Sequence, residues 1–332
     1  MTLTTSTAGK VVPGGPRQVA SELGVSNKVS CHTDGSVVVV SPSTRPLNPQ
    51  LGEVVSGSKP VDGGWLTVYP EEYEEVMADP IAAQYVKKYI GARELLHDEE
   101  RYCLWLTDAE ADEVRTSPLL LKRVEGVRAF RAGSQAASTR EAASKPHLFQ
   151  QIAQPSTAYL CIPAHVSQSR PYFLAARFGH DVVTSNANFL TADTDGFIFA
   201  MISSTMFITW QHAVGRRIRS DLRFNKLLTW NTFPLPPTET DARRRIIAAG
   251  EGVMAVRQSQ PDLSLADLNA PTTMSNELIN AHESLDGEVD QLFGLISQHA
   301  AELERQVVLC TRYQEMAGAS VGAKTSARLP GI

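Results

Sequence analysis

The chain has 332 residues, of which 42% are hydrophobic, and its formal net charge is −5. This length suffices for about two domains with sizeable cores, and the acidic balance excludes a uniformly basic nucleic-acid-binding protein. The N-terminus lacks the basic stretch and apolar run of a signal peptide. The most apolar stretch, Phe197 to Trp210, is too short and too rich in Ser and Thr to span a bilayer. We therefore expect a cytoplasmic protein without membrane contact.

The two ends and the cysteines bound the fold further. Residues 1–27 and 317–332 are rich in small and polar residues and offer little apolar surface to offset the entropy of ordering, so we expect both segments to be flexible. None of the cysteines belongs to a CxxC pair, which disfavours a zinc site or a disulfide framework. We expect four reduced, buried thiols, at Cys31, Cys103, Cys161 and Cys310.

The first half of the chain mixes strand and helix signals. Apolar runs beside turn residues predict strands at 37–40, 65–69 and 101–106. Residues 70–90 read as a helix, because Glu residues near its start and Lys residues near its end suit the helix dipole. A longer helical pattern covers about 112–143.

The second half changes character at a proline-rich stop. Short strands are predicted at 159–162, 172–176 and 182–184, followed by a buried helix that starts near Gly196. The stretch 231–237, Asn-Thr-Phe-Pro-Leu-Pro-Pro, marks a domain boundary. After it the apolar spacing is purely helical, with Ser275 as an N-cap. The fold class expected is a mixed α/β (α+β) domain over 28–236 followed by a small all-α module over 237–316.

The motifs of common catalytic sites are missing. A methyltransferase that uses S-adenosylmethionine needs a glycine-rich strand-to-helix loop, and one that methylates adenine also needs an Asn/Asp-Pro-Pro-aromatic loop. Neither is present; the nearest string, Asn48-Pro49-Gln50, lacks the second proline and the aromatic residue. A P-loop, a HExxH site, a GxSxG elbow and an acidic nuclease cluster are also missing. We therefore predict no catalytic, cofactor-binding or metal-binding residue in this chain.

One segment does carry a pattern that suits binding. Residues 215–226 hold five cations and one carboxylate between a buried apolar segment and the domain boundary. Such a segment can neutralise phosphates with some arginines and contact base edges with others. A solvated, charged turn explains the same pattern equally well.

Several strings, in order from about 28 to 316, resemble the target-recognition and C-terminal regions of the type IIL, MmeI-type restriction–modification enzymes. They are Pro60-Val61-Asp62-Gly63-Gly64, Tyr89-Ile90-Gly91-Ala92-Arg93-Glu94, Glu100-Arg101-Tyr102-Cys103-Leu104-Trp105-Leu106, Tyr159-Leu160-Cys161-Ile162-Pro163, the stretch 216–234, Leu265-Ala266-Asp267-Leu268 and Ala281-His282-Glu283-Ser284-Leu285-Asp286.

The resemblance implies sequence-specific recognition of double-stranded DNA for an adenine-N6 DNA methyltransferase. Residues 28–236 would be its target-recognition domain. Because this chain matches only the recognition and C-terminal parts, the methyltransferase half, with its S-adenosylmethionine, is expected on a separately encoded partner. Two alternatives stay open: a stand-alone DNA-binding regulator, or a non-functional remnant of a split restriction–modification gene.

The resemblance also assigns roles to residues. It places the segment 219–223 in the major groove, so that Arg219, Asp221 and Arg223 read bases. Arg219 could donate to guanine while Asp221, two residues away in an extended segment, accepts from cytosine. Phosphate contacts are expected from Arg216, Arg217, Lys226, Lys122, Arg123, Arg128 and Arg131. The large aromatic residues Trp105, Trp210, Trp230 and Phe233 read as core.

Overall fold

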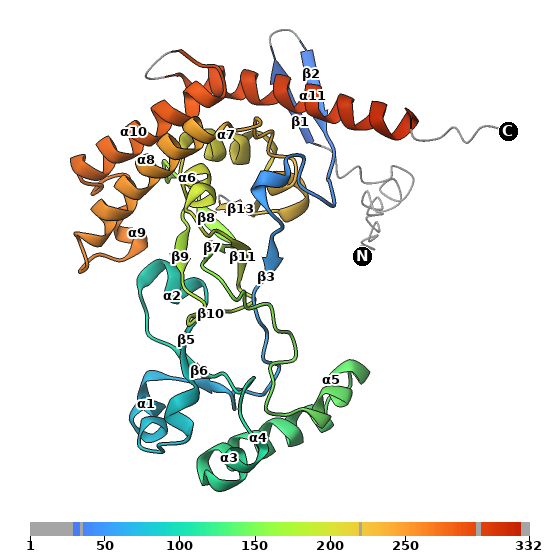
Figure 1. Cartoon of the computed structure of the whole chain (residues 1–332), viewed down its shortest axis with the longest axis vertical. Helices are drawn as coiled ribbons and strands as arrows, with labels where there is room; N and C mark the ends of the chain where they lie inside the picture. Colours follow the sequence, from blue (N-terminus) through green and yellow to red (C-terminus); the bar gives the residue numbers. More distant parts are fainter. Residues whose placement is uncertain (1–28, 34–35, 219–220, 297–299, 327–332) are drawn as a thin grey trace, which may run out of the picture.

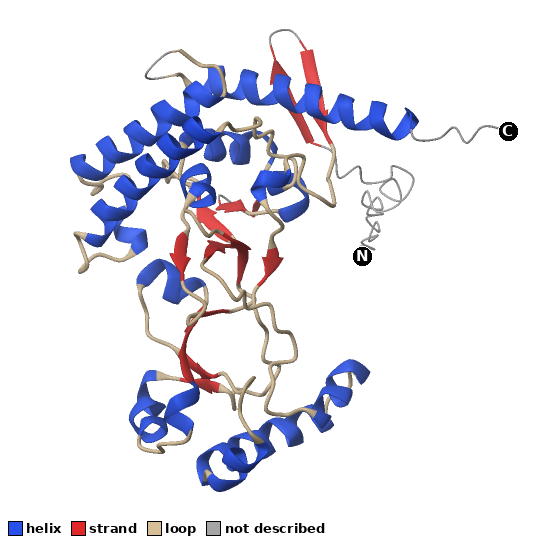
Figure 2. Cartoon of the chain, viewed as in Figure 1, coloured by secondary structure: helices blue, strands red, loops and turns tan. Residues whose placement is uncertain are grey.

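The chain forms two lobes built on separate β-sheets, the upper and the lower in Figure 1. The computed structural model describes residues 29–33, 36–218, 221–296 and 300–326. The lower lobe comprises residues 59–151 together with strand β10, and the upper lobe comprises the other described residues. Figure 2 shows that most strands occupy the middle of the molecule, while helices and the β1–β2 hairpin lie at its top and further helices at its bottom.

The upper lobe surrounds an antiparallel sheet with the strand order β3-β11-β7-β9. Its central strand β7 is buried along its whole length, as its apolar sequence Tyr-Leu-Cys-Ile-Pro requires. The other elements of this lobe before the proline-rich boundary are small strands, short helices and a π-helical turn. The bounds are β1 (Val29–Thr33), β2 (Ser36–Val40), η1 (Pro49–Leu51), β3 (Val55–Ser56), β7 (Tyr159–Pro163), β8 (His165–Ser167), β9 (Ala176–Phe178), β11 (Asn188–Ala192), α6 (Phe197–Ile202), α7 (Thr205–Val214), β12 (Arg216–Ile218), β13 (Asp221–Arg223) and η4 (Lys226–Trp230).

The lower lobe is a second four-stranded sheet, in the order β10-β5-β6-β4, with helices around it. Only the pair β10 and β5 is parallel. Leu66, Leu104, Leu120 and Val127 lie in its separate hydrophobic core. The bounds are β4 (Thr67–Val68), α1 (Pro70–Met77), η2 (Ala82–Tyr85), β5 (Val86–Ile90), α2 (Ala92–His97), β6 (Tyr102–Leu104), α3 (Ala111–Thr116), α4 (Pro118–Ala132), α5 (Ala137–Glu141), η3 (Ala142–Ser144) and β10 (Val183–Thr184).

Both long helices predicted for this lobe are wrong in extent. The predicted helix 70–90 ends at Met77, and residues 86–90 form strand β5. Pro80 disfavours a helical conformation at the residue before it and has no N–H to continue a helix. The carboxylate of Asp79 instead accepts hydrogen bonds from the amides of Ile81 and Ala82. The predicted helix 112–143 is three helices, because Ser117 caps a new helix at its Oγ and Pro118 opens it.

The C-terminal module is all-helical and shares the core of the upper lobe. Ile246, Val253, Leu278 and Leu285 belong to the same hydrophobic cluster as Phe207. The N-cap predicted at Ser275 is confirmed, since its Oγ accepts a hydrogen bond from the Leu278 amide at 3.2 Å. Together with the mixed fold of the preceding residues, this confirms the predicted α+β class. The bounds are α8 (Thr240–Gln258), α9 (Leu265–Leu268), α10 (Asn276–Leu292) and α11 (Glu302–Ser326).

The expectation of four reduced thiols is wrong, because one of the cysteines in the described residues, Cys310, forms a disulfide bond. Cys103 and Cys161 are free and buried, and burial raises the pKa of the Cys161 thiol to about 12. Cys310 lies on α11. For Cys31 the structure describes only the backbone, in strand β1. Among the described helices, none combines the length and the apolarity that crossing a membrane demands.

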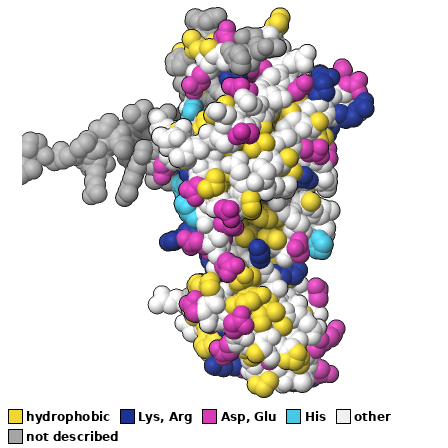
Figure 3. Space-filling view, turned by 90° about the vertical axis from the view of Figure 1, so that its left-hand side faces the viewer, with side chains coloured by type: hydrophobic (Ala, Val, Ile, Leu, Met, Phe, Trp, Pro, Cys, Tyr) yellow, Lys and Arg dark blue, Asp and Glu magenta, His cyan; other side chains and the backbone are white. Residues whose placement is uncertain are grey.

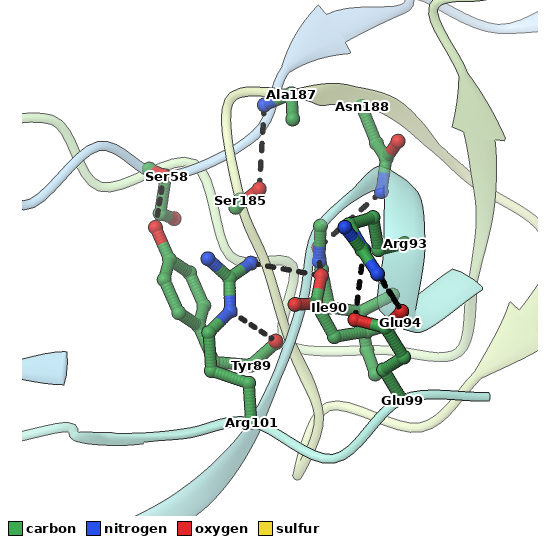
Figure 4. Close-up of polar contacts among 11 residues, drawn as sticks. Ser58, Tyr89, Ile90, Arg93, Glu94, Glu99, Arg101, Ser185, Ala187 and Asn188 are labelled. Carbon is green, nitrogen blue, oxygen red and sulfur yellow. Dashed lines mark hydrogen bonds and ion pairs between the residues drawn. The ribbon is translucent and has the colours of Figure 1, made fainter. Parts of the chain in front are cut away.

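The two lobes meet at a short junction, shown in Figure 4. The Ser58 amide donates to the Thr184 carbonyl at 2.8 Å, and the Ser185 amide donates to the Ile90 carbonyl at 2.9 Å. Arg101 lies over the Tyr89 ring at 4.6 Å and forms a 3.0 Å ion pair with Glu94. The two backbone bonds connect the edge of the upper sheet to strands β5 and β10 of the lower one, and the contacts of Arg101 brace the lower side of the junction.

The C-terminal module is anchored to α7 by a buried carboxyl group. The Thr205 amide donates to Asp286 Oδ1 at 2.6 Å, and the Thr205 hydroxyl donates to Oδ2. Burial is the largest influence and raises the pKa of Asp286 to about 6, although the bonds from Thr205 lower it. The group therefore holds its proton more tightly in the folded chain than in the unfolded chain.

We predict that this carboxyl group makes folding pH-dependent in a defined window. Its stabilising contribution is fully present below its unfolded pKa of 3.8 and is lost as the pH rises through about 6. The Asp286→Asn variant keeps the amide oxygen as an acceptor but does not titrate. Urea unfolding should therefore show that the unfolding free energy of wild type, relative to that of Asp286→Asn, falls by about 3 kcal/mol in total between about pH 3 and about pH 7 and levels off above that range. Parallel pH profiles for the two proteins would contradict the assignment.

Candidate nucleic-acid interface

A small three-stranded sheet presents polar side chains on the surface of the upper lobe. Its strand order is β12-β13-β8, and both pairs are antiparallel. Along β13, Asp221 and Arg223 are exposed and Leu222 is buried; along β8, His165 and Ser167 are exposed and Val166 is buried. Because side chains alternate between the two faces of a strand, the four exposed residues share one face. We call this set, His165, Ser167, Asp221 and Arg223, the polar face.

The register brings the polar face together in pairs. Arg223 lies opposite His165, and Asp221 lies opposite Ser167. Residues directly opposite each other in an antiparallel pair have their Cβ atoms about 5 Å apart. A guanidinium group and an imidazole therefore neighbour each other, as do a carboxylate and a hydroxyl group. Within the described residues, neither Asp221 nor Arg223 has a side-chain hydrogen bond or an ion pair, so their donors and acceptors stay open to a ligand.

The polar face rests on a rigid support. Leu222 and Phe224 are buried, and the Phe224 ring contacts the rings of Phe173, Phe189 and Trp230 at centroid distances of 5.1–6.0 Å. The Gln211 side-chain amide on α7 donates to the Arg223 carbonyl at 2.9 Å. Buried packing and hydrogen bonds on the inner face thus hold strand β13 in place while its outer side chains stay free.

The predicted base-reading residues are only partly described. Asp221 and Arg223 lie on the polar face, whereas Arg219 lies outside the described residues. Ile218 lies opposite Asp221 in the β12–β13 register, so the chain reverses direction between them. Whether Arg219 and Asp221 lie on the same side stays a prediction, because residues 219–220 are outside the described residues.

Of the three residues near this sheet that are predicted to contact phosphates, the structure describes the side chain of Lys226 alone. Lys226 is half-buried at the start of η4. For Arg216 and Arg217 the structure describes only the backbone, which places Arg216 opposite Arg223. His165 and Ser167 were not predicted. The alternation of the sequence His-Val-Ser, directly after the predicted strand at 159–162, is the signal that could have indicated them.

The predicted basic face of helix α4 divides into two kinds of residue. Lys122 and Arg128 are exposed, and Arg128 lies 3.4 Å from Glu125. Arg123 and Arg131 are buried. Helix α4 packs in the lower lobe, whereas the polar face belongs to the upper lobe. The ten residues predicted to contact DNA therefore do not form one cluster.

A phosphate role for Arg123 and Arg131 is wrong, because their guanidinium groups bind the protein itself. Arg131 donates five hydrogen bonds of 2.7–3.1 Å to main-chain carbonyl groups, those of Pro60, Val61, Ala142, Lys145 and Leu148. Arg123 donates to the carbonyls of Trp65 and Thr67 and forms a 2.9 Å ion pair with Glu72. Both arginines hold the loop before β4 against α4.

The core role predicted for the large aromatic residues is confirmed. Trp105, Trp210, Trp230 and Phe233 are all buried. The indole N–H of Trp210 donates to the Thr229 carbonyl at 3.1 Å, and that of Trp230 donates to the Gly52 carbonyl at the same distance. Trp210, Trp230 and Phe233 belong to the core of the upper lobe, which supports the polar face, and Trp105 belongs to the core of the lower lobe. None of the four buried rings can stack on bases.

The chemistry of the candidate site is recognition. It offers a guanidinium group, a carboxylate, an imidazole and a hydroxyl group, which together match the donors and acceptors on base edges. Groups of His, Cys, Asp or Glu arranged to hold a metal ion do not occur among the described residues. The face of the molecule drawn in Figure 3 carries scattered Asp and Glu side chains and no continuous basic patch.

Comparisons with known proteins bear on both parts of the chain. The family model for the target recognition domain of MmeI matches residues 34–237, and the model for the C-terminal domain of MmeI matches residues 238–320. DNA methyltransferase A of Bacillus subtilis (strain 168) is 32% identical over 293 residues, which make up 88% of this chain and 33% of that protein.

A solved structure is similar over most of the chain. It is that of the type IIL restriction–modification enzyme MmeI in complex with DNA, which is 33% identical and superposes with a TM-score of 0.78. The match covers 84% of this chain and 37% of that one. The chain thus spans about a third of the length of both relatives.

Two arginines of α4 allow a direct test of the buried cluster. We predict that Arg131→Met destabilises the chain by roughly 3–5 kcal/mol, because five main-chain carbonyls lose their donor. The matched variant Arg128→Met, one turn earlier on the exposed side, should change stability by less than about 0.5 kcal/mol. Urea unfolding of both variants measures the difference. Equal effects would mean that the carbonyl cluster does not hold the lower lobe together.

Proposed function

The chain belongs to the MmeI family, through both the target recognition domain and the C-terminal domain, and on that basis we propose that it recognises a specific sequence in double-stranded DNA. The recognition would serve an adenine-N6 DNA methyltransferase of a type IIL restriction–modification system. This role implies a cytoplasmic location, where the DNA is.

The observation that carries the proposal is the polar face on its buried support. Sequence readout requires side chains that stay exposed and hold their positions, because immobilising flexible groups on binding costs affinity. Asp221 and Arg223 meet both conditions: they are exposed, and they flank Leu222, which is buried. The structure of MmeI, which is similar to this chain over 84% of its length, was solved in complex with DNA.

The chemistry of the face suits the edge of a G·C pair in the major groove. Guanine presents the acceptors N7 and O6 there, and cytosine presents its N4 amino group as a donor. Arg223 can donate two parallel hydrogen bonds to guanine, and Asp221 can accept one from cytosine. Arg219, which precedes β13, would act beside them as a further donor. Lys226, Arg216 and Arg217 would hold phosphates around the contact.

The catalytic step belongs, in this proposal, to a methyltransferase domain that lies outside these 332 residues. That domain would bind S-adenosylmethionine and hold the adenine turned out of the duplex. The support is twofold: the sequence has neither the glycine-rich loop nor the Asn/Asp-Pro-Pro-aromatic loop, and one relative is named as a DNA methyltransferase. The chain itself would supply specificity and no reacting group.

We predict that Arg223→Ala changes sequence preference rather than general affinity. Selection of duplexes from a randomised library, followed by sequencing, should show a loss of roughly tenfold or more in discrimination at one base-pair position. Binding of the wild-type chain should weaken steeply with salt, since each phosphate that is neutralised contributes about −0.9 to the log–log slope.

Arg128→Ala is the matched control, because Arg128 is an equally exposed arginine away from the polar face. If Arg128 contacts a phosphate, its loss lowers the affinity for all sequences alike and reduces the salt slope by about 0.9. A base preference unchanged by Arg223→Ala and altered by Arg128→Ala would overturn the assignment of the polar face. Selection of a symmetric site by a dimer would favour a stand-alone regulator instead.

A separate prediction concerns the cofactor. We expect no binding of S-adenosylmethionine by this chain in calorimetric titration, since neither loop that the cofactor requires is present in the sequence. Micromolar binding would show that the chain has a cofactor site of an unrecognised type. Adding the partner methyltransferase should restore both cofactor binding and methylation of the selected duplex.

A further inference from the structure

A cavity lies where the C-terminal module meets the two lobes. Its volume is about 360 Å³, and its walls come from α2, β9, α6, α8 and α9. Most of the wall is apolar, including Leu95, Phe178, Phe199, Met254 and Leu265. The region faces the viewer in Figure 3, where hydrophobic side chains appear between the upper and lower parts of the molecule. A cavity of this size and lining is typical of a small-molecule site.

One charged side chain in the wall has no counter-charge. The Nη1 atom of Arg257 donates to the Ala175 carbonyl at 3.1 Å, and the guanidinium group lies 5.3 Å from the Phe199 ring centre. Its Nε and Nη2 atoms are buried and have no hydrogen-bond partner within the described structure. Burial alone lowers the pKa of Arg257 to about 10, so the group still carries its charge at neutral pH.

Three buried arginines differ from Arg257, which is partly exposed although its Nε and Nη2 atoms are buried. Arg131 has five carbonyl partners, Arg123 pairs with Glu72, and Arg305 forms a 2.6 Å ion pair with Asp290. A buried cation without a partner is costly, because the loss of hydration is not offset. An anion placed beside Arg257 would offset this cost.

The remaining charges of the cavity wall do not satisfy Arg257. Glu94 is taken by Arg101 at 3.0 Å, and Arg177 is taken by Asp193 at 3.1 Å. Lys88 and Asp98 are exposed at the rim, where water screens them. The wall thus combines apolar side chains with one buried, uncompensated positive charge.

We propose that this cavity binds a small organic anion with an apolar body, whose carboxylate is held by Arg257. The apolar body would contact the leucine, phenylalanine and methionine side chains, and the carboxylate would accept hydrogen bonds from Nε and Nη2 after a small movement of the flexible arginine stem. Such a ligand would stabilise the contact between the C-terminal module and both lobes. None of the residues that line the cavity belongs to the polar face.

A different partner for Arg257 has to be tested against this one. The Nε2 atom of His282 is also buried without a hydrogen-bond partner, and Arg257 contributes to lowering the pKa of His282 to about 3. A water molecule between the two side chains would satisfy both. In that case Arg257 would need no ligand, and its removal would destabilise the chain without affecting any binding.

The experiment is calorimetric titration of the whole chain with three probes: octanoate, octan-1-ol and acetate. Octanoate carries both the apolar body and the anion, octanol lacks the anion, and acetate lacks the apolar body. We expect octanoate to bind at least tenfold more tightly than either of the others. Equal affinities for octanoate and octanol would mean an apolar cavity without anion recognition, and no octanoate binding at millimolar concentration would overturn the proposal.

Three variants identify the residue responsible. Arg257→Met keeps the bulk of the stem and removes the charge. This variant should therefore bind octanoate no more tightly than octan-1-ol. Arg243→Met is the matched control on the same helix, because Arg243 lies over the Phe197 ring at 4.0 Å but has an ion pair with Asp195 at 2.9 Å. It should bind octanoate like wild type. Octanoate binding that survives Arg257→Met would refute the role of Arg257.

Leu263→Trp blocks the cavity from its rim and keeps the test decisive if Arg257→Met does not fold. Leu263 is 45% exposed, so a larger side chain there leaves the core intact. The variant should lose both octanoate and octanol binding while retaining its affinity for DNA. Unchanged octanoate binding in Leu263→Trp would place the ligand elsewhere and overturn the proposal.

Discussion

The position of the lower lobe depends on a close backbone approach between residues 57–58 and residues 184–188. The Gly57 amide donates to the Asn188 carbonyl at 3.0 Å, and a Cβ atom at Gly57 would lie 2.2 Å from the Ser185 carbonyl oxygen. Only glycine fits at such a distance. The Ser58 hydroxyl then accepts a hydrogen bond from the Ala153 amide at 3.0 Å. The segments that enter and leave the lower lobe are therefore tied to the same point of the upper sheet.

Side chains that stabilise the fold and side chains that are free to bind a ligand are different residues of the chain. Arg123, Arg131 and Asp286 all have partners inside the protein, and so do the indole N–H groups of Trp210 and Trp230. These groups stabilise the support. On β13 the donors and acceptors of Asp221 and Arg223 are left free, although Leu222 between them is buried. A strand can combine these properties because its two faces are independent. The Gln211 bond to the Arg223 carbonyl adds stiffness without occupying the guanidinium group.

The sequence predicted the fold class and the aromatic core because both follow from composition and apolar spacing. It could not separate Arg123 and Arg131 from Lys122 and Arg128, since helical periodicity tells which residues share a face but not what covers that face. The partners of Arg131 are carbonyl groups from as far as 71 residues away in the chain. Likewise, His165 joins the polar face only through the pairing of β8 with β13. Contacts that depend on strand pairing leave little trace in local sequence.

The acidic net charge of the chain does not argue against sequence-specific DNA binding. Affinity for random DNA comes mostly from phosphates and counterion release, whereas discrimination comes from base contacts. Helix α1 carries four glutamates, Glu71, Glu72, Glu74 and Glu75, whose negative charge disfavours a phosphate nearby. With little general attraction, residence on DNA depends on the few groups that match a base edge. A weak non-specific affinity therefore raises the ratio of specific to non-specific binding, which is the quantity that a recognition domain must maximise among many competing sites.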